Sequence, residues 1–212
     1  MENETKTRIL ACAQAEFSQK GFMRASLRSI CKNAGVTTGA LYFFFKDKED
    51  LFASIVKEPL ERVNAILLMH YQGQRIRMQA SVLAMEDFTL CSDKWEQLLP
   101  VLYEYREQFL LLLTGAQGSA FETIRDSFVA IEQKENELLV HEMMRRFHIQ
   151  SVDASVIRWI SQLHVEAFID IVVHRATQSE AFDYLHQIFP YLASGWCGIL
   201  GLTRECAEWR LG

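Results

Sequence analysis

Residues 26–51, SLRSICKNAGVTTGALYFFFKDKEDL, constrain the fold of this chain more than any other segment. Apolar residues recur at helical spacing from Leu27 to Ala34, and Ser26 stands just before them as an N-cap. Gly35 follows as the residue that ends the helix, because glycine enters the left-handed region without steric cost. The segment therefore predicts a short helix that stops at a glycine turn.

A second short helix is predicted directly after this turn. Thr37 or Thr38 can cap it, and Leu41 and Phe45 lie four residues apart, so both face inward. In a helix-turn-helix pair of this kind, the second helix enters the major groove of DNA. The pattern predicts a DNA-binding function.

Residues 34–52, AGVTTGALYFFFKDKEDLF, resemble the recognition-helix segment of the tetracycline-repressor (TetR) family of bacterial transcription regulators. The matching positions are Ala34, Gly35, Val36, Leu41, Tyr42, Phe45, Lys48 and Leu51, preceded by Ile9, Ala13, Phe17, Gly21, Phe22 and Ile30. The close resemblance covers about residues 5–55. It implies an all-α fold of about nine or ten helices: an N-terminal three-helix DNA-binding domain, and a larger helical domain for ligand binding and dimerisation.

Helical spacing dominates the whole chain, which holds only three prolines and ten glycines. We expect a DNA-binding domain at residues 1–47 and a ligand-binding and dimerisation domain at residues 48–212. A helix that starts at Asp47 joins the two without a flexible linker. The expected helices of the first half span about residues 4–20, 27–34, 38–44, 48–72 and 75–91, and Gly73 ends the fourth. One helix then begins at Asp93, and a short one ends near Gly115. The last three span about residues 119–147, opened by a Ser119–Glu122 capping box, 153–176, and 179–202, capped by Ser179.

The charge is unevenly distributed along the chain. The formal net charge is −5, yet residues 1–48 hold eight Lys/Arg and four Asp/Glu, which leaves −9 on the remainder. A basic head on an acidic body suits a protein that presents one end to phosphates.

Several side chains of the predicted helix pair are candidates for DNA contact. Arg28 could bind a guanine edge or a phosphate, the alternative being a solvated surface arginine. The first turn of a recognition helix contacts base edges, whereas Thr37 could serve as a cap alone. The resemblance places Tyr42 near phosphates, and Lys48 adds charge to a helix N-terminus. The full predicted set is Ser26, Arg28, Thr37, Thr38, Gly39, Tyr42, Phe43 and Lys48.

Two phenylalanines of this segment need a separate explanation. If Leu41 and Phe45 face the core, Phe43 and Phe44 must face largely outward. Contact with DNA sugars or thymine methyl groups would explain their exposure. The alternative is that one ring packs against Phe22 or the long helix.

The last two expected helices carry more apolar surface than one core needs. Phe182, Leu185, Phe189, Leu192, Trp196 and Ile199 form a heptad seam beside a second apolar stripe, and Pro190 should kink this helix. The surplus predicts a symmetric homodimer through a four-helix bundle, the alternative being a large monomeric core. The predicted interface comprises Phe168, Ile171, Val172, Tyr184, Ile188, Tyr191, Leu192, Gly195 and Trp196.

Large aromatic and methionine side chains in the central helices could line a ligand cavity, which the family resemblance implies. Their ordinary role is in a hydrophobic core. The predicted ligand-binding residues are Phe88, Trp95, Tyr103, Phe109, Phe128, Met143, Phe147, Trp159 and His164. We expect a small apolar or aromatic effector, held by a few polar groups such as Tyr103 or His164.

Other kinds of function find little support. His141–Glu142 begins like a zinc-protease motif, but Arg145 stands where the second histidine is required, and no catalytic residue, metal site or cofactor is expected. The apolar runs are shorter than a membrane span and no signal peptide is recognisable, so a cytoplasmic protein is expected. The five scattered cysteines are then expected to be reduced and buried.

These features together predict a homodimeric, ligand-responsive transcription regulator, and no enzyme. It would repress from a palindromic operator in double-stranded DNA and be released by an effector. One alternative is a DNA-binding regulator that a protein partner controls. Another is a helical small-molecule-binding protein with a vestigial head, against which the basic head and the Thr37–Thr38 turn argue.

Overall fold

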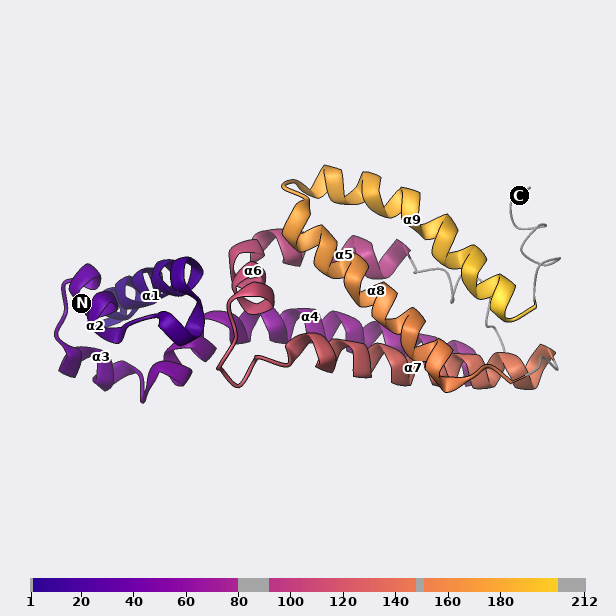
Figure 1. Ribbon diagram of the computed structural model, residues 1–212, viewed down its shortest axis with the longest axis horizontal. Coiled ribbons are helices and arrows are strands. Elements are labelled where there is room, and N and C mark those ends of the chain that lie inside the picture. The colour runs from indigo at the N-terminus through magenta and orange to yellow at the C-terminus, as the bar shows by residue number, and fades with distance from the viewer. Residues whose placement is uncertain (1, 80–91, 148–150, 202–212) are drawn as a thin grey trace. The chain divides into compact units, whose positions relative to one another are not determined.

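The computed structural model describes residues 2–79, 92–147 and 151–201, and within these ranges it holds nine α-helices and no strand (Figure 1). The predicted all-α fold is confirmed. The helices are α1 (Glu2–Arg24), α2 (Leu27–Ala34), α3 (Thr38–Phe44), α4 (Lys48–Gln79), α5 (Ser92–Glu104), α6 (Arg106–Thr114), α7 (Ile124–Phe147), α8 (Ala154–His174) and α9 (Gln178–Ile199). No helix in the described ranges is long and apolar enough to cross a membrane.

The chain divides into two compact units. The first comprises residues 1–63 and 104–125, and the second comprises residues 64–103 and 126–212. Helix α4 therefore contributes to both, and α6 belongs with α1–α3 although it lies far from them in sequence. The expected division of function between residues 1–47 and 48–212 stays a prediction.

The predicted side-chain caps and the glycine turn of the helix pair are present. Gly35 adopts the left-handed conformation with a φ of 63°, and its N–H bonds the carbonyl of Lys32. The Ser26 hydroxyl accepts from the N–H of Ser29 at 3.4 Å, and that of Thr37 accepts from the N–H of Ala40 at 3.2 Å. Both helices of the pair thus begin at a side-chain cap and occupy the predicted residues.

The long helix is longer than predicted. Asp47 caps its start, since its carboxylate accepts from the N–H of Asp50 at 2.8 Å, but Gly73 does not break it and α4 continues to Gln79. One glycine costs a helix only about 1 kcal/mol, and buried Tyr71 and Gln74 beside it supply tertiary packing. The predicted helix over residues 75–91 is therefore not separate at its start, and its remainder lies outside the described residues.

Two further helix starts differ from the prediction. The Ser119 hydroxyl donates to the carbonyl of Ala116 at 2.7 Å, so the Ser119–Glu122 capping box does not form and α7 begins at Ile124. Helix α9 begins after Thr177, not Ser179, because Thr177 and Glu180 form a reciprocal capping box. The residue that caps a helix is the one at which the chain enters it, and that entry point depends on the fold.

The cysteines differ in part from the prediction. Cys31 is a buried free thiol and Cys12 a half-buried one, as expected of reduced residues. Cys197 in α9 is buried but disulfide-bonded, so the expectation of five reduced cysteines is wrong for it.

Candidate nucleic-acid interface and effector site

The helix pair is oriented by a core that α1 and the start of α4 share with it. Phe52 of α4 makes edge-to-face contacts with Phe17 and Phe22, at ring-centroid separations of 5.1 and 5.2 Å. Leu41 and Phe45 are buried, which confirms their inward orientation. The core of this unit also holds Ile9, Ala13, Ile30, Ala34, Leu51 and Val56.

A buried carboxylate fastens the first helix of the pair to α1. Glu16 accepts from the Lys20 ammonium at 2.7 Å, from the N–H of Ser26 at 3.1 Å and from the Ser29 hydroxyl at 3.1 Å. The hydrogen bond from Lys20 lowers the pKa of Glu16 more than burial raises it, and the bonds from Ser26 and Ser29 lower it further. Glu16 was not among the residues predicted from the sequence, although its place beside Ala13 and Phe17 on the apolar face of α1 could have indicated it.

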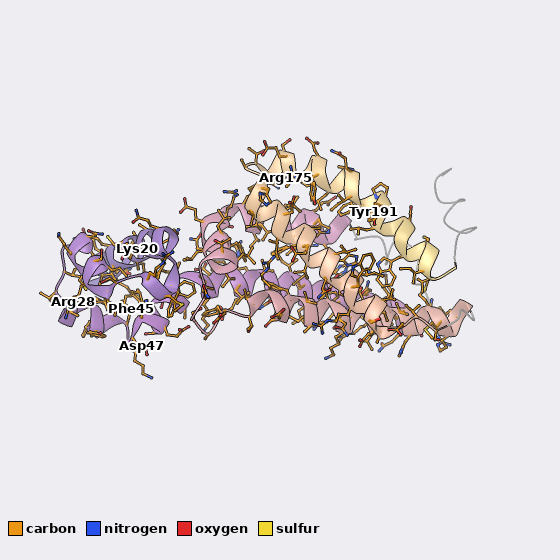
Figure 2. The ribbon with its side chains drawn as sticks, in the orientation of Figure 1. Lys20, Arg28, Phe45, Asp47, Arg175 and Tyr191 are labelled. Carbon is orange, nitrogen blue, oxygen red and sulfur yellow. The ribbon has the colours of Figure 1, made fainter. Side chains whose placement is uncertain are left out.

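The predicted DNA-contacting residues of α2 and α3 lie together in the first unit and face solvent. Arg28 is exposed on α2 (Figure 2), and Ser26, Thr37, Thr38 and Gly39 are exposed at the two helix starts. Tyr42 and Phe43 are 52% and 73% exposed. The first unit therefore exposes polar and aromatic side chains on α2 and α3 that do not belong to its core.

The two anomalous phenylalanines differ in their surroundings. Phe43 projects into solvent, whereas Phe44 is half-buried with its ring centroid 5.1 Å from that of Phe43 and 6.3 Å from that of Phe45. Phe44 thus packs on the helix pair itself, and neither Phe22 nor α4 is needed to explain it. The exposure of Phe43 alone remains for a binding partner to explain.

Lys48 is more constrained than a surface lysine. Its ammonium donates to the carbonyl of Met23 at 3.1 Å and lies 4.8 Å from the centre of the Phe22 ring. Burial lowers the pKa of Lys48, while the charge of Glu16 raises it. The side chain therefore ties the start of α4 to the end of α1, and its predicted DNA contact stays a prediction.

Helix α6 and the residues after it are hydrogen-bonded to α1 and α4 of the first unit. The N–H of Phe22 donates to the carbonyl of Gly115 at 2.7 Å, Gln14 donates to Glu107 at 2.8 Å, and the N–H of Ala120 donates to Glu49 at 2.9 Å. Gly21 precedes this bond with a φ of 72°, a left-handed conformation that L side chains rarely adopt. No local sequence pattern indicated this link.

The predicted ligand-binding residues do not form one group. Trp95 of α5, Phe128 of α7 and His164 of α8 belong to one aromatic and polar region of the second unit. Met143 packs in a core cluster that also holds Trp196, whose ring contacts His164. Tyr103 donates its hydroxyl to the carbonyl of Arg175 at 3.2 Å. Phe109 is buried in the first unit, Trp159 is 54% exposed, and Phe88 and the side chain of Phe147 lie outside what is described.

An acidic residue lies at the centre of this region. Glu132 of α7 accepts from the Tyr71 hydroxyl and from His164 Nδ1 at 2.9 Å, with the Lys94 ammonium 3.7 Å away. The sequence analysis named only His164 among these four. Glu132, Glu135, Asn136 and Leu139 recur on one helical face, a pattern that could have indicated polar groups turned inward. Among the described residues, no group of His, Cys, Asp and Glu could hold a metal ion.

The residues predicted to form the dimer interface differ in how far they are buried. Ile171, Val172, Leu192 and Trp196 are buried inside their own unit. Phe168, Tyr184 and Ile188 are half-buried, and Gly195 is exposed on α9. Tyr191 is 68% exposed on the same helix (Figure 2).

The N-terminal helices match the family model described as bacterial regulatory proteins of the tetR family, over residues 9–55. The transcriptional regulator AcrR of Shigella flexneri is 28% identical over 151 residues, which are 68% of this chain and 70% of AcrR. The transcriptional repressor BepR of Brucella suis biovar 1 is 33% identical over 112 residues, 50% of this chain and 53% of BepR.

The fold extends the similarity to almost the whole chain. A crystal structure of a transcriptional regulator from Aquifex aeolicus VF5 superposes with a TM-score of 0.53 at 20% identity, covering 86% of this chain and 96% of that one. Fold, helix pair and relatives together define a transcriptional regulator with an N-terminal helix-turn-helix domain. Residues 9–55 thus carry the helix-turn-helix domain of the tetR family of bacterial regulatory proteins.

Glu16 provides a test of how the helix pair is held. Replacing Glu16 with Gln keeps the shape but removes the charge-assisted bonds, so we expect a loss of about 2 kcal/mol in the free energy of unfolding near neutral pH. Because the folded-state pKa of Glu16 is lowered, its contribution is present above the ordinary pKa and is lost as pH falls through the folded value.

Thermal unfolding followed by circular dichroism between pH 3 and 7 measures this difference. The matched control is Glu4→Gln, at an exposed acid of the same helix. Equal melting temperatures for the two variants at pH 7 would show that Glu16 does not stabilise the head.

Proposed function

We propose that this protein is a homodimeric repressor that binds a palindromic operator and is released from it by a small apolar or aromatic effector. The exposed residues of α2 and α3, whose helices are held by side-chain caps and an aromatic core, carry the proposal. The relative BepR, a transcriptional repressor by name, supports repression over activation. A partner that is chromosomal DNA implies a cytoplasmic protein.

The exposed residues divide into two roles at the DNA. Thr37, Thr38 and Gly39 open α3, where small side chains allow the backbone close to base edges, and Phe43 offers an apolar surface to thymine methyl groups. Arg28 supplies a bidentate donor for guanine, while Tyr42 and the cap at Ser26 lie at the flank for phosphates. The net charge of +4 over residues 1–48 adds sequence-independent affinity.

Dimerisation would place two recognition helices in successive major grooves. The exposed side of α9, with Tyr191, Gly195, Gly198 and Ile199, supports this assembly. A Cβ built at Gly195 or Gly198 meets nothing within 4 Å, so the backbone of α9 is open to close approach by a second helix. The residues already buried in the unit, such as Trp196, would support this surface from behind.

An effector in the second unit would act on the head through two covalent routes. Helix α4 runs from one unit into the other, and residues 104–125 leave the second unit, bond the head and return. A change in the spacing of α5 and α7 would therefore reach the head through both ends of that segment. By linkage, an effector that weakens operator binding must itself bind more weakly to the operator complex, by the same factor.

Sequence-specific binding can be tested at Arg28. We expect Arg28→Ala and Thr38→Ala to change the preferred operator sequence and to cost about 1–3 kcal/mol for each lost base contact. Wild-type affinity should fall steeply with salt as phosphate contacts release counterions. The measurement is a random-oligonucleotide selection followed by anisotropy titrations at several salt concentrations.

Lys32→Ala is the control, because it removes an exposed cation from the same helix as Arg28. It should weaken all sequences slightly and equally. Unchanged sequence preference in both test variants would mean that α2 and α3 do not read the operator.

The proposed dimer surface can be tested at Gly195. Because an added side chain meets nothing inside the protomer, Gly195→Leu should leave the fold intact and still prevent close helix approach between copies. We expect a shift from dimer to monomer in sedimentation velocity and a loss of operator affinity of at least tenfold, as the second half-site contact is lost.

The control for this test is Ile131→Asp, at an apolar residue of α7 that is 40% exposed and lies outside α8 and α9. It should remain dimeric. A dimeric Gly195→Leu variant would place the interface on another surface.

A further inference from the structure

A groove in the first unit is lined only by α1, α6 and the residues that follow α6. Its volume is about 1070 Å³, and its α1 side carries Ala11, Ala15 and Ser18 at helical spacing. These three residues are exposed, so the groove is open to solvent on its α1 side. Its lining includes none of the predicted DNA-contacting residues and nothing from the second unit. The groove is therefore separate from the proposed operator and effector sites.

Hydrogen bonds hold the two sides of the groove together. Gln14 of α1 donates to Glu107 in the first turn of α6 at 2.8 Å. The N–H of Phe22 donates to the carbonyl of Gly115, just after α6, at 2.7 Å. Both ends of α6 are thus joined to α1, and the groove is a built-in feature of the first unit.

The apolar part of the groove includes an exposed methionine. Leu110 and Leu111 line its α6 side, and Met23 of its α1 side is 64% exposed. The other large apolar residues exposed in the described part of this unit, Tyr42 and Phe43, belong to α3 and to the predicted DNA-contacting set. Met23 therefore needs a separate explanation. Methionine is common at surfaces that bind helices, because its flexible side chain adapts to the partner.

The groove carries opposite charges at its two ends. Glu107 makes the first contact with α1, whereas Lys20 (Figure 2) and Arg24 lie within two residues of the second contact, at Phe22. The Lys20 ammonium is paired with buried Glu16 at 2.7 Å. No oxygen of a described residue pairs with the Arg24 guanidinium, so Arg24 is free to pair with a bound partner.

The form of the groove favours a helix over other ligands. The described ranges contain no strand whose edge an extended peptide could join. Of the described residues that line the groove, only Phe22 is aromatic, whereas proline-rich peptides bind aromatic-lined grooves. Small-molecule sites enclose most of their ligand, but here the α1 side is exposed. A helix about 10 Å across occupies roughly 120 Å³ per residue, so the volume corresponds to about nine residues, or two to three turns.

We propose that the groove between α1 and α6 binds an amphipathic helix of a partner protein, with an acidic residue at the end beside Arg24. Apolar side chains at positions i, i+4 and i+7 of that helix contact Leu110 and Met23, and the small residues of α1 allow its backbone to approach closely. The acidic residue pairs with the free Arg24 guanidinium. This inference does not rest on the proposed operator or effector, because the groove shares no residue with either site.

Peptide selection on the full-length protein tests this proposal. The probe is a phage-displayed library of peptides of about 14 residues, long enough to form a helix, with leucine fixed at positions i, i+4 and i+7 and both ends randomised. Fluorescence anisotropy then measures synthetic copies of the enriched peptides. Ala15→Arg fills the groove from an exposed position and should weaken their binding about tenfold or more. Ala130→Arg, at an exposed alanine of α7 outside the groove, should bind them as the wild type does.

A charge reversal at Arg24 tests the polarity of the groove. The enriched peptides should carry Asp or Glu at one end, and Arg24→Glu should weaken their binding about threefold, a change typical of an exposed ion pair. The same peptides with Lys in place of that acid should bind Arg24→Glu more tightly than the wild type. Arg8→Glu makes the same charge change at an exposed position of α1 outside the groove and should leave both affinities unchanged.

The proposal fails if no enriched peptide loses affinity for Ala15→Arg, or if the peptides carry a basic residue at the end that Arg24→Glu affects. A different oligomeric state of Ala15→Arg without peptide, measured by sedimentation velocity, would assign the groove to contact between copies of this chain and overturn the partner protein. Circular dichroism confirms that the variants are folded. Ser18→Arg, at a second exposed position of the same side, decides the question if Ala15→Arg does not fold.

Discussion

The packing of Phe52 is the contact on which the first unit depends. Its ring meets Phe17 and Phe22 of α1 and, at 6.0 Å, Phe121 of the segment that follows α6. One side chain near the start of α4 thus holds the helix on which the head is built and a segment from beyond residue 100. The exposed residues of α2 and α3 keep their positions because this aromatic core fixes the helices beneath them.

The same unit shows how a DNA-binding head can be linked to distant parts of its chain. Hydrogen bonds at Gly115, Glu107 and Ala120 attach residues 104–125 to α1 and α4. The first unit therefore comprises α1–α3, the start of α4 and α6, and not the three N-terminal helices alone. Hydrogen bonds of Lys48 with Met23 and of Glu16 with Ser26 connect the starts of α4 and α2 to α1. Residues 104–125 are covalently continuous with α5 and α7 of the second unit, so the proposed effector response would reach the head through this segment.

In the second unit, a buried cluster of polar side chains lies among the helices for which the sequence predicted mainly aromatic and methionine residues around a ligand. Glu132 is paired there with Tyr71, Lys94 and His164, which come from three other helices. Trp95, Phe128 and His164 fall in this region, whereas Met143 belongs to the hydrophobic core cluster of the same unit and Phe109 is buried in the first unit. A residue type that often lines ligand sites is also the usual filling of a helical core, so composition could not separate the two uses.

The features that could be predicted from the sequence are those that depend on residues close together along the chain. The two short helices, their caps at Ser26 and Thr37, and the left-handed Gly35 follow from local propensity, and so do the inward positions of Leu41 and Phe45. Tertiary structure decided what depends on packing: the continuation of α4 past Gly73, the start of α9 at Thr177, the burial of Trp196, and the assembly of Glu132 with residues up to 61 positions away. Local signals fix helices because the hydrogen bonds of a helix are local, whereas buried polar pairs form only after the fold has brought separate helices together.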